Sequence, residues 1–281
     1  MPTVTVNGVD LYYEEEGSGT PLILLHEFSG DYRSWEPQMR FFARRYRVVT
    51  MSYRGYPPSS IPDDPTAYSQ EILLDDILGL CDALNIEKAH FCGLSIGGNS
   101  VIFLGLNHPE RCLSLVAAAA GHGSVSDPAE RTDFEKDFTS RAERLLTEGM
   151  TVVGEEQAGK PNRMPMKIKD PRGWAEFRDQ LLEHSAVGSA HTASGLNAKR
   201  PNFFDMETEL TGMNVPTLVV VGDQDLHCLE GSLYLKRVLP LAGLHMFPMS
   251  GHLINIEEPD LFNRAVLDFL TAVESQKWIK P

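Results

Sequence analysis

A serine stands between glycines in the sequence Gly-Leu-Ser-Ile-Gly-Gly at 93–98, at a predicted junction between a strand and a helix. An apolar run precedes it at 89–92, and an apolar stretch with helical periodicity follows at 101–106. A nucleophile elbow requires this context, because positions two before and two after the serine have room for almost no side chain. The alternative is a helix start with a capping serine. The elbow interpretation predicts that Ser95 is presented for attack on a carbonyl carbon.

A serine hydroxyl needs a neighbouring base, and His252 is the best-placed histidine. It follows a predicted strand end in a Ser-Gly-His loop that leads to the last helix. The imidazole in turn needs a carboxylate that fixes its tautomer. Asp225 is favoured over Asp223, because it lies further into the loop after a late strand, where its carboxylate can turn toward His252. Asp223 is interpreted as a cap on the local turn.

The elements that must position these residues are predicted from periodicity. An Asn-Gly turn between two alternating segments near the start predicts an edge hairpin. Later strands are expected at short apolar runs that are too continuous for a sheet with one wet face, and helical patterns separate most of them. The runs lie at 22–25, 48–51, 89–92, 113–118, 217–221 and 244–247. We therefore expect an α/β fold with a mostly parallel, doubly wound sheet of about eight strands flanked by helices.

The alternation stops from 122 to 213, where the sequence is polar, rich in charge and helical in its periodicity. One amphipathic helix is predicted over 134–145, and a second begins at Asp170-Pro171. The segment 154–165 between them is expected to be a loop. Positive charge concentrates at 160–172, which indicates either a solvated face or attraction of an acidic substrate. This stretch is interpreted as a helical insertion after the sixth strand.

The composition argues against several classes of function. With 39 acidic and 25 basic residues the formal charge is −14, so the chain repels nucleic acid and anionic membrane surfaces. No stretch reaches the ~20 apolar residues that span a bilayer, and no secretory signal pattern opens the sequence, so a cytoplasmic location is expected. The four cysteines are scattered and form no zinc-like cluster with histidines. We expect reduced cysteines and no metal.

Four segments together resemble the α/β-hydrolase superfamily. They are the elbow at Ser95, the loop Leu-His-Glu-Phe at 25–28, Gly-Asp-Gln-Asp at 222–225 and Ser-Gly-His at 250–252. The chain order Ser, Asp, His also agrees with that superfamily. The resemblance spans residues 4–270 and implies a hydrolase core of 1–121 and 214–281 with a helical cap at 122–213. It implies no cofactor.

The developing oxyanion requires two backbone N–H donors. Ile96 is predicted to supply one, and the resemblance implies that Phe28 supplies the other. The sequence departs from the family pattern at Glu27, where glycine is usual after the histidine. Glu27 is interpreted either as a tie that accepts backbone N–H bonds within the loop or as a residue that borders the pocket and selects the leaving group or water.

The predicted function is a serine hydrolase that cleaves a small carboxylic ester, lactone or thioester. Hydrolysis of a carbon–carbon bond or an activated amide in a keto-acid-like substrate remains an alternative, as does a hydrolase-fold receptor for a small molecule with slow turnover. The proposed substrate contacts, besides Glu27, are His122, Trp174 and His184, each of which packing alone would also explain. The expected partner is a small molecule, and a homo-oligomer is left open.

Overall fold

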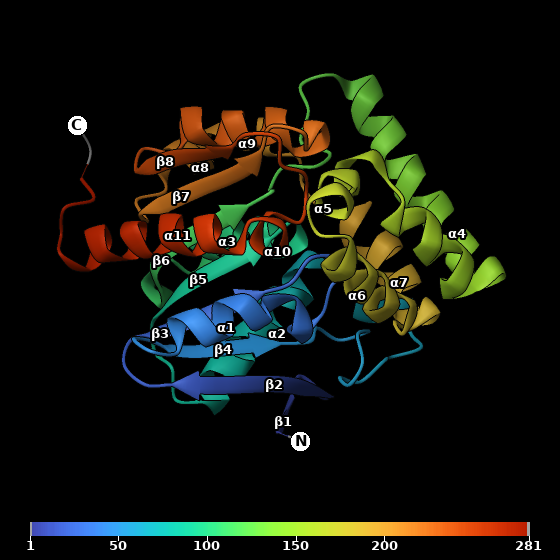
Figure 1. Ribbon diagram of the computed structural model, residues 1–281, viewed down its shortest axis with the longest axis horizontal. Coiled ribbons are helices and arrows are strands. Elements are labelled where there is room, and N and C mark those ends of the chain that lie inside the picture. The colour runs from blue at the N-terminus through green and yellow to red at the C-terminus, as the bar shows by residue number, and fades with distance from the viewer. Residues whose placement is uncertain (1, 280–281) are drawn as a thin grey trace.

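One eight-stranded sheet crosses the molecule in the order β1-β2-β4-β3-β5-β6-β7-β8, in a computed structural model that describes residues 2–279 (Figure 1). β1 pairs with β2 and β2 with β4 in antiparallel fashion, and the other neighbours are parallel. Strands β5 and β7 are buried at every residue, as their continuous apolar sequences predict. The predicted fold class is therefore confirmed. The bounds are β1 Thr3–Val6, β2 Val9–Gly17, β3 Pro21–Leu25, β4 Arg47–Met51, β5 Ala89–Leu94, β6 Cys112–Ala118, β7 Thr217–Gly222 and β8 Ala242–Phe247.

The first two strands form the predicted hairpin at the edge of the sheet. Asn7 and Gly8 connect β1 to β2 with φ angles of 49° and 76°. Two successive residues in the left-handed region are the requirement of the tightest hairpin turn, and Asn-Gly is the pair that adopts it most readily.

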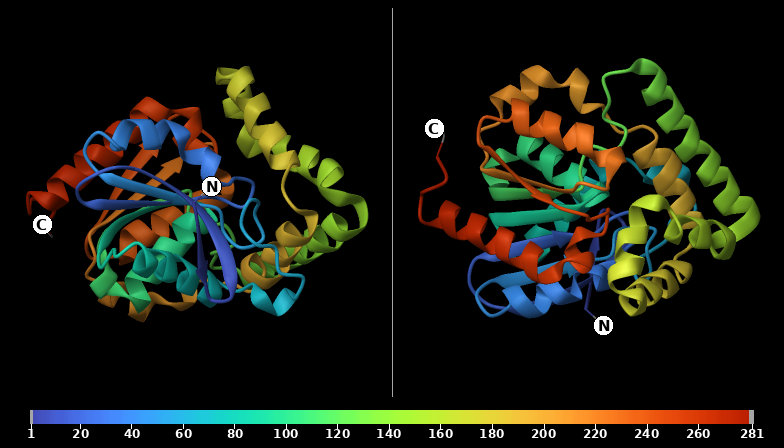
Figure 2. Two further views of the ribbon diagram at one scale, coloured as in Figure 1. Left: turned by 90° about the horizontal axis from the view of Figure 1, so that it is seen from below. Right: turned by 45° about the horizontal axis from the view of Figure 1, so that its top comes forward.

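Helices cover both faces of the sheet (Figure 2). α1 packs with α11 on one face, while α2, α3 and α9 cover the other. Local sequence sets the starts of these helices: the Ser69 hydroxyl accepts a hydrogen bond from the Ile72 N–H at α2, and Pro259 occupies the first turn of α11. Within residues 2–279, no helix has both the length and the apolar character needed to span a bilayer. The bounds are α1 Glu36–Phe42, α2 Gln70–Ala83, α3 Ile96–Asn107, α9 Leu226–Val238, α10 Ile254–Glu257 and α11 Pro259–Glu274.

A helical insertion, residues 128–212, follows β6 and lies beyond the carboxyl ends of the parallel strands (Figure 1). Both predicted amphipathic helices are present, with Phe134 and Phe138 buried on α4 and Phe177 and Leu181 buried on α6. Gly149, at φ 83° and ψ 172°, breaks α4 into two arms. The bounds are α4 Pro128–Ala158, α5 Met164–Lys169, α6 Pro171–Leu182, α7 Ala186–His191 and α8 Glu207–Gly212.

The prediction of a loop at 154–165 is wrong. α4 continues to Ala158, and only two residues separate it from a short 3₁₀ turn, Pro161–Arg163, after which α5 begins. Gly154 lies against α6, where a β-carbon would come within 2.8 Å of Leu182 Cδ2. Close packing between helices therefore explains a glycine that on propensity alone argues against a helix.

Candidate active site

Ser95 occupies the sharp turn between β5 and α3, with φ 56° and ψ −107°. The flanking glycines are required sterically. A β-carbon on Gly93 would lie 2.1 Å from the Gly97 carbonyl oxygen, and one on Gly97 would lie 2.1 Å from the Leu25 carbonyl oxygen. Because the backbone is held in a conformation that non-glycine residues rarely adopt, the serine stands at the carboxyl edge of the sheet rather than within the strand.

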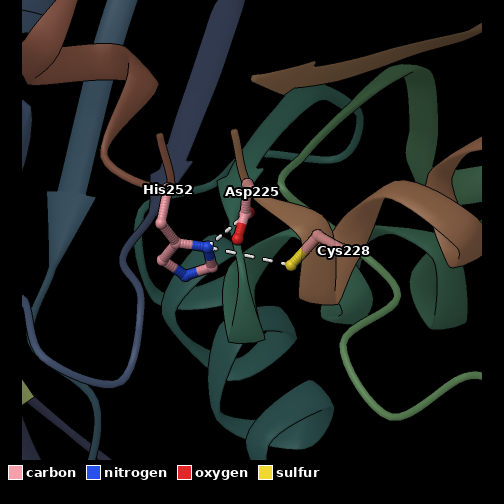
Figure 3. A group of neighbouring side chains, drawn as sticks. All are labelled: Asp225, Cys228 and His252. Atoms are coloured by element: carbon pink, nitrogen blue, oxygen red, sulfur yellow. Dashed lines mark hydrogen bonds and ion pairs between the residues drawn. The ribbon is translucent and has the colours of Figure 1, made fainter. Parts of the chain in front are cut away.

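His252 and Asp225 form a buried hydrogen-bonded pair. The imidazole Nδ1 lies 2.6 Å from Asp225 Oδ2 (Figure 3). Burial alone would raise the pKa of Asp225, but the charge and hydrogen bond of His252 outweigh it and hold that pKa well below its usual range. A carboxylate at Nδ1 fixes the tautomer that leaves Nε2 able to accept a proton. Asp223, the alternative acid, instead accepts the Ser250 N–H at 3.3 Å and closes the local turn.

Cys228 is the third member of this group, with Sγ 3.7 Å from His252 Nδ1 (Figure 3). In the described part of the chain, Asp225, Cys228 and His252 are the one trio of potential metal ligands whose donor atoms lie within 4.8 Å of one another. Burial, and then the charge of Asp225, raise the pKa of the Cys228 thiol well above its usual value. A protonated thiol is a poor metal ligand. The expectation that no metal is needed stays a prediction.

A cavity of about 220 Å³ brings Ser95 and His252 to one surface. The core contributes one wall and the helical insertion the other. We call them the core wall and the insertion wall. The core wall consists of Glu27, Phe28, Ser95, His122, His227 and His252. The insertion wall is mainly polar and consists of Asp137, Phe138, Arg141, Gln157, Lys160, Asn162, Arg163, Asn197 and Arg200.

The loop after β3 carries two predicted site residues to this cavity, Glu27 and Phe28. His26 anchors the loop, since its Nδ1–H donates to the Glu27 carbonyl at 2.7 Å and its Nε2 accepts the Tyr53 N–H at 3.1 Å. Burial lowers the pKa of His26 to about 4, so the ring is neutral and structural. Ile96, the other predicted oxyanion donor, directly follows Ser95 as the first residue of α3.

His122, one of the proposed substrate contacts, also lines the cavity, and its contact with substrate stays a prediction. Its ring lies 5.1 Å from that of His227 and 4.9 Å from that of Phe134. Burial, and then the neighbouring His227, lower the pKa of His122 well below its usual value. The ring therefore offers a neutral surface to the cavity that it shares with Ser95.

Two predicted substrate contacts lie outside this cavity, which corrects their assignment. The Trp174 indole donates to the Ala158 carbonyl at 3.1 Å and so joins α6 to the end of α4. His184 is buried with Nε2 3.4 Å from Asp31 Oδ2 and its ring 5.3 Å from that of Tyr56. Both side chains are used in packing the helical insertion onto itself or onto the core.

Glu27 forms a buried ion pair with the insertion. Its Oε2 accepts from Arg163 Nη2 at 2.9 Å and lies 3.8 Å from His252 Nε2. The other carboxylate oxygen, Oε1, is buried and has no hydrogen-bond partner among the described residues. The side chain therefore borders the cavity, and it accepts a hydrogen bond from a guanidinium rather than from backbone N–H groups of its own loop.

Sequence reasoning missed Asn162, which braces the His252–Asp225 pair from the insertion wall. Its side-chain amide donates to Asp225 Oδ1 at 3.1 Å, and its carbonyl accepts the His252 N–H at 2.8 Å. The residue lies in the segment expected to be a loop, 63 positions from Asp225. No spacing signal in the sequence connects the two.

The sequence profile of the alpha/beta hydrolase fold family matches residues 20–259, and the chain belongs to that family. The chain is 30% identical to a putative carbamate hydrolase, RutD, of Caulobacter sp. strain K31, over 96% of this chain and 98% of the relative. It is 26% identical to 3-oxoadipate enol-lactonase 1 of Acinetobacter baylyi, over 90% and 89%. A solved esterase from Thermogutta terrifontis superposes with a TM-score of 0.85 at 26% identity, over 96% of this chain and 97% of that one.

Proposed function

We propose that this α/β hydrolase is a serine hydrolase that cleaves a small carboxylic ester, lactone or thioester. The observation that carries the proposal is the 2.6 Å pair of His252 and Asp225 on a cavity that also exposes Ser95. Relatives named as a lactonase, an esterase and a carbamate hydrolase support attack on an acyl carbon.

In the first half of the reaction, Ser95 Oγ attacks the carbonyl carbon while His252 Nε2 takes its proton. Asp225 holds the imidazole and stabilises the imidazolium that forms. The N–H groups of Ile96 and Phe28 receive the oxyanion. His252 then returns the proton to the leaving group, and an acyl-enzyme remains on Ser95. Water repeats these steps and releases the acid.

The helical insertion acts as the cap of this site. It closes the cavity over Ser95, and Asn162 holds Asp225 in the orientation that His252 requires. Glu27 acts through its position beside His252 Nε2, where Arg163 balances its charge. The carboxylate thus shapes the space in which the leaving group and the attacking water must fit.

The test is multiple turnover on 4-nitrophenyl butyrate, γ-valerolactone and S-ethyl thiobutyrate. Wild type is expected to turn over at least one of them repeatedly, and Ser95→Ala is expected to lose about 10³-fold or more in kcat. A fluorophosphonate probe should label wild type on the peptide that contains Ser95. Ser194→Ala is the matched control, because its hydroxyl donates to the Ala190 carbonyl within the insertion.

Two results would contradict the proposal. Full activity in Ser95→Ala would show that Ser95 is not the nucleophile. Tight binding of these compounds by Ser95→Ala, with negligible turnover by wild type, would instead indicate a receptor.

A further inference from the structure

The insertion wall carries more positive charge than the protein around it offsets. Four cationic side chains line the cavity, Arg141, Lys160, Arg163 and Arg200, against two carboxylates, Glu27 and Asp137. Each carboxylate is already paired: Glu27 with Arg163 at 2.9 Å, and Asp137 with Arg141 at 2.5 Å. In a chain of formal charge −14, this surplus is a local and specific arrangement.

Arg200 is one of the two cations left over. It is 2% exposed, and across residues 2–279 no carboxylate lies within 4.0 Å of its guanidinium. Its Nη1 donates to Asn197 Oδ1 at 3.1 Å, its Nη2 donates to the His122 carbonyl, and its Nε has no partner within the same range. Burial, and then the charge of Arg131, lower the pKa of Arg200 to about 9, which leaves it charged at neutral pH.

Lys160 is the second cation that lacks a carboxylate partner. It is half-buried at the junction of α4 and the 3₁₀ turn, and no ion pair joins it to a carboxylate of the described chain. Burial, and then the charge of Arg141, lower the pKa of Lys160 to about 8. A buried or half-buried cation without a counterion is costly, and a negatively charged ligand would offset that cost.

We propose that the substrate bears a free carboxylate in addition to the bond that is cleaved, and that Arg200 and Lys160 bind this carboxylate. The inference rests on the proposed function and narrows it to monoesters of small dicarboxylic acids and to lactones with a carboxylate substituent. The ester carbonyl meets Ser95 on the core wall while the carboxylate faces the cations of the insertion wall. Binding energy from the charged end thereby orients the reacting end.

The experiment uses two esters that differ in charge and hardly in shape, ethyl hemisuccinate and ethyl succinamate. Both release ethanol, which is measured directly. Wild type is expected to favour the hemisuccinate by at least about tenfold in kcat/KM. In Arg200→Gln and in Lys160→Gln the ratio is expected to fall at least about fivefold, mainly through KM for the charged ester.

Two controls separate charge from folding. Arg172→Gln makes the same change in net charge on an exposed residue of α6 outside the cavity, and it should keep the wild-type ratio. Arg200 is buried and its loss can disturb the fold, so Lys160→Gln, at a half-buried position, provides the second reading of the same prediction.

Turnover of both esters at equal kcat/KM would overturn this inference while the proposed function stood. An unchanged ratio in well-folded Lys160→Gln and Arg200→Gln would also overturn it. If wild type hydrolyses neither ester, calorimetry on Ser95→Ala decides the inference separately. Binding of the hemisuccinate at least about tenfold more tightly than the succinamate would support it, and equal binding would overturn it.

Discussion

The core wall and the insertion wall of the cavity differ in how completely their charges are satisfied. Behind the core wall, Asp225 is paired with His252 at 2.6 Å and accepts a hydrogen bond from Asn162 of the insertion wall at 3.1 Å. On the insertion wall, Arg200 and Lys160 have no carboxylate counterpart in the described structure. The charges of the His252–Asp225 pair are therefore satisfied before substrate binds, whereas the two cations of the insertion wall can be paired by a bound substrate. The first arrangement suits reaction chemistry and the second suits recognition.

The largest expected effect comes from changing the carboxylate that supports His252 of the core wall. Asp225→Asn should lower kcat about 10⁴-fold with little change in KM. The amide favours the wrong tautomer of His252 and cannot stabilise the imidazolium that forms during the reaction. Steady-state kinetics on the best ester measure this. Asp223→Asn is the matched control and should retain activity within about threefold, since that carboxylate serves a turn. Equal losses in the two variants would contradict the assignment of Asp225.

The next effect concerns the ion pair that joins the two walls. Arg163→Met should lower the free energy of unfolding by about 3–5 kcal/mol, because Glu27 is left buried without its counterion. Adding Glu27→Gln to that variant should recover much of the loss. Urea denaturation of the single and double variants checks this. Additive losses would mean that the two side chains do not stabilise each other.

A smaller effect tests whether Asn162, a residue of the insertion wall, contributes to the reaction step rather than to substrate binding. Asn162→Ala should lower kcat about tenfold while KM changes little, because it removes a hydrogen bond that orients Asp225. Asn214→Ala is the control, since its amide donates to the Gly212 carbonyl away from the cavity. A change confined to KM would place Asn162 with the recognition residues instead.

The smallest effect is a pH dependence on the insertion wall. The pKa of Lys160 is about 8, and the charged groups that act on its ammonium are Arg141, Asp137, Arg163 and Glu156. A lysine is cationic below its pKa, so KM for ethyl hemisuccinate should rise about threefold between pH 7 and 9 as the charge is lost. The neutral succinamate should show no such rise, and Lys160→Gln should reduce the difference to the part that Arg200, with a pKa of about 9, contributes. An identical pH dependence of KM for the two esters would contradict the prediction that the charge of Lys160 contributes to binding.

The fold and most residues of the core wall could be predicted from the sequence because the necessary signals are local; His227, which also lines that wall, was not predicted. Gly93 and Gly97 mark the elbow, since each position excludes a β-carbon, and continuous apolar runs mark the buried strands. Each of Ser95, Asp225 and His252 lies just after one strand, so parallel topology alone brings all three to one edge of the sheet.

The insertion wall was predicted less well, because its residues are assembled by helix packing between segments without a common signal. Of the basic cluster at 160–172, only Lys160 and Arg163 reach the cavity. Lys169 instead pairs with Glu257 and Glu258 near α11. The aromatic Trp174 was an attractive contact by residue type, yet it packs against α4, while Arg141 and Arg200 carried no spacing signal at all.

Asn162 and Arg163 are consecutive residues of one short turn, and they hold two different parts of the machinery: the aspartate behind the imidazole and the loop that carries Glu27. Because the two residues are adjacent in the chain, one local rearrangement of this turn would disturb both contacts together, so the orientation of Asp225 and the tether of Glu27 depend on the same three-residue segment.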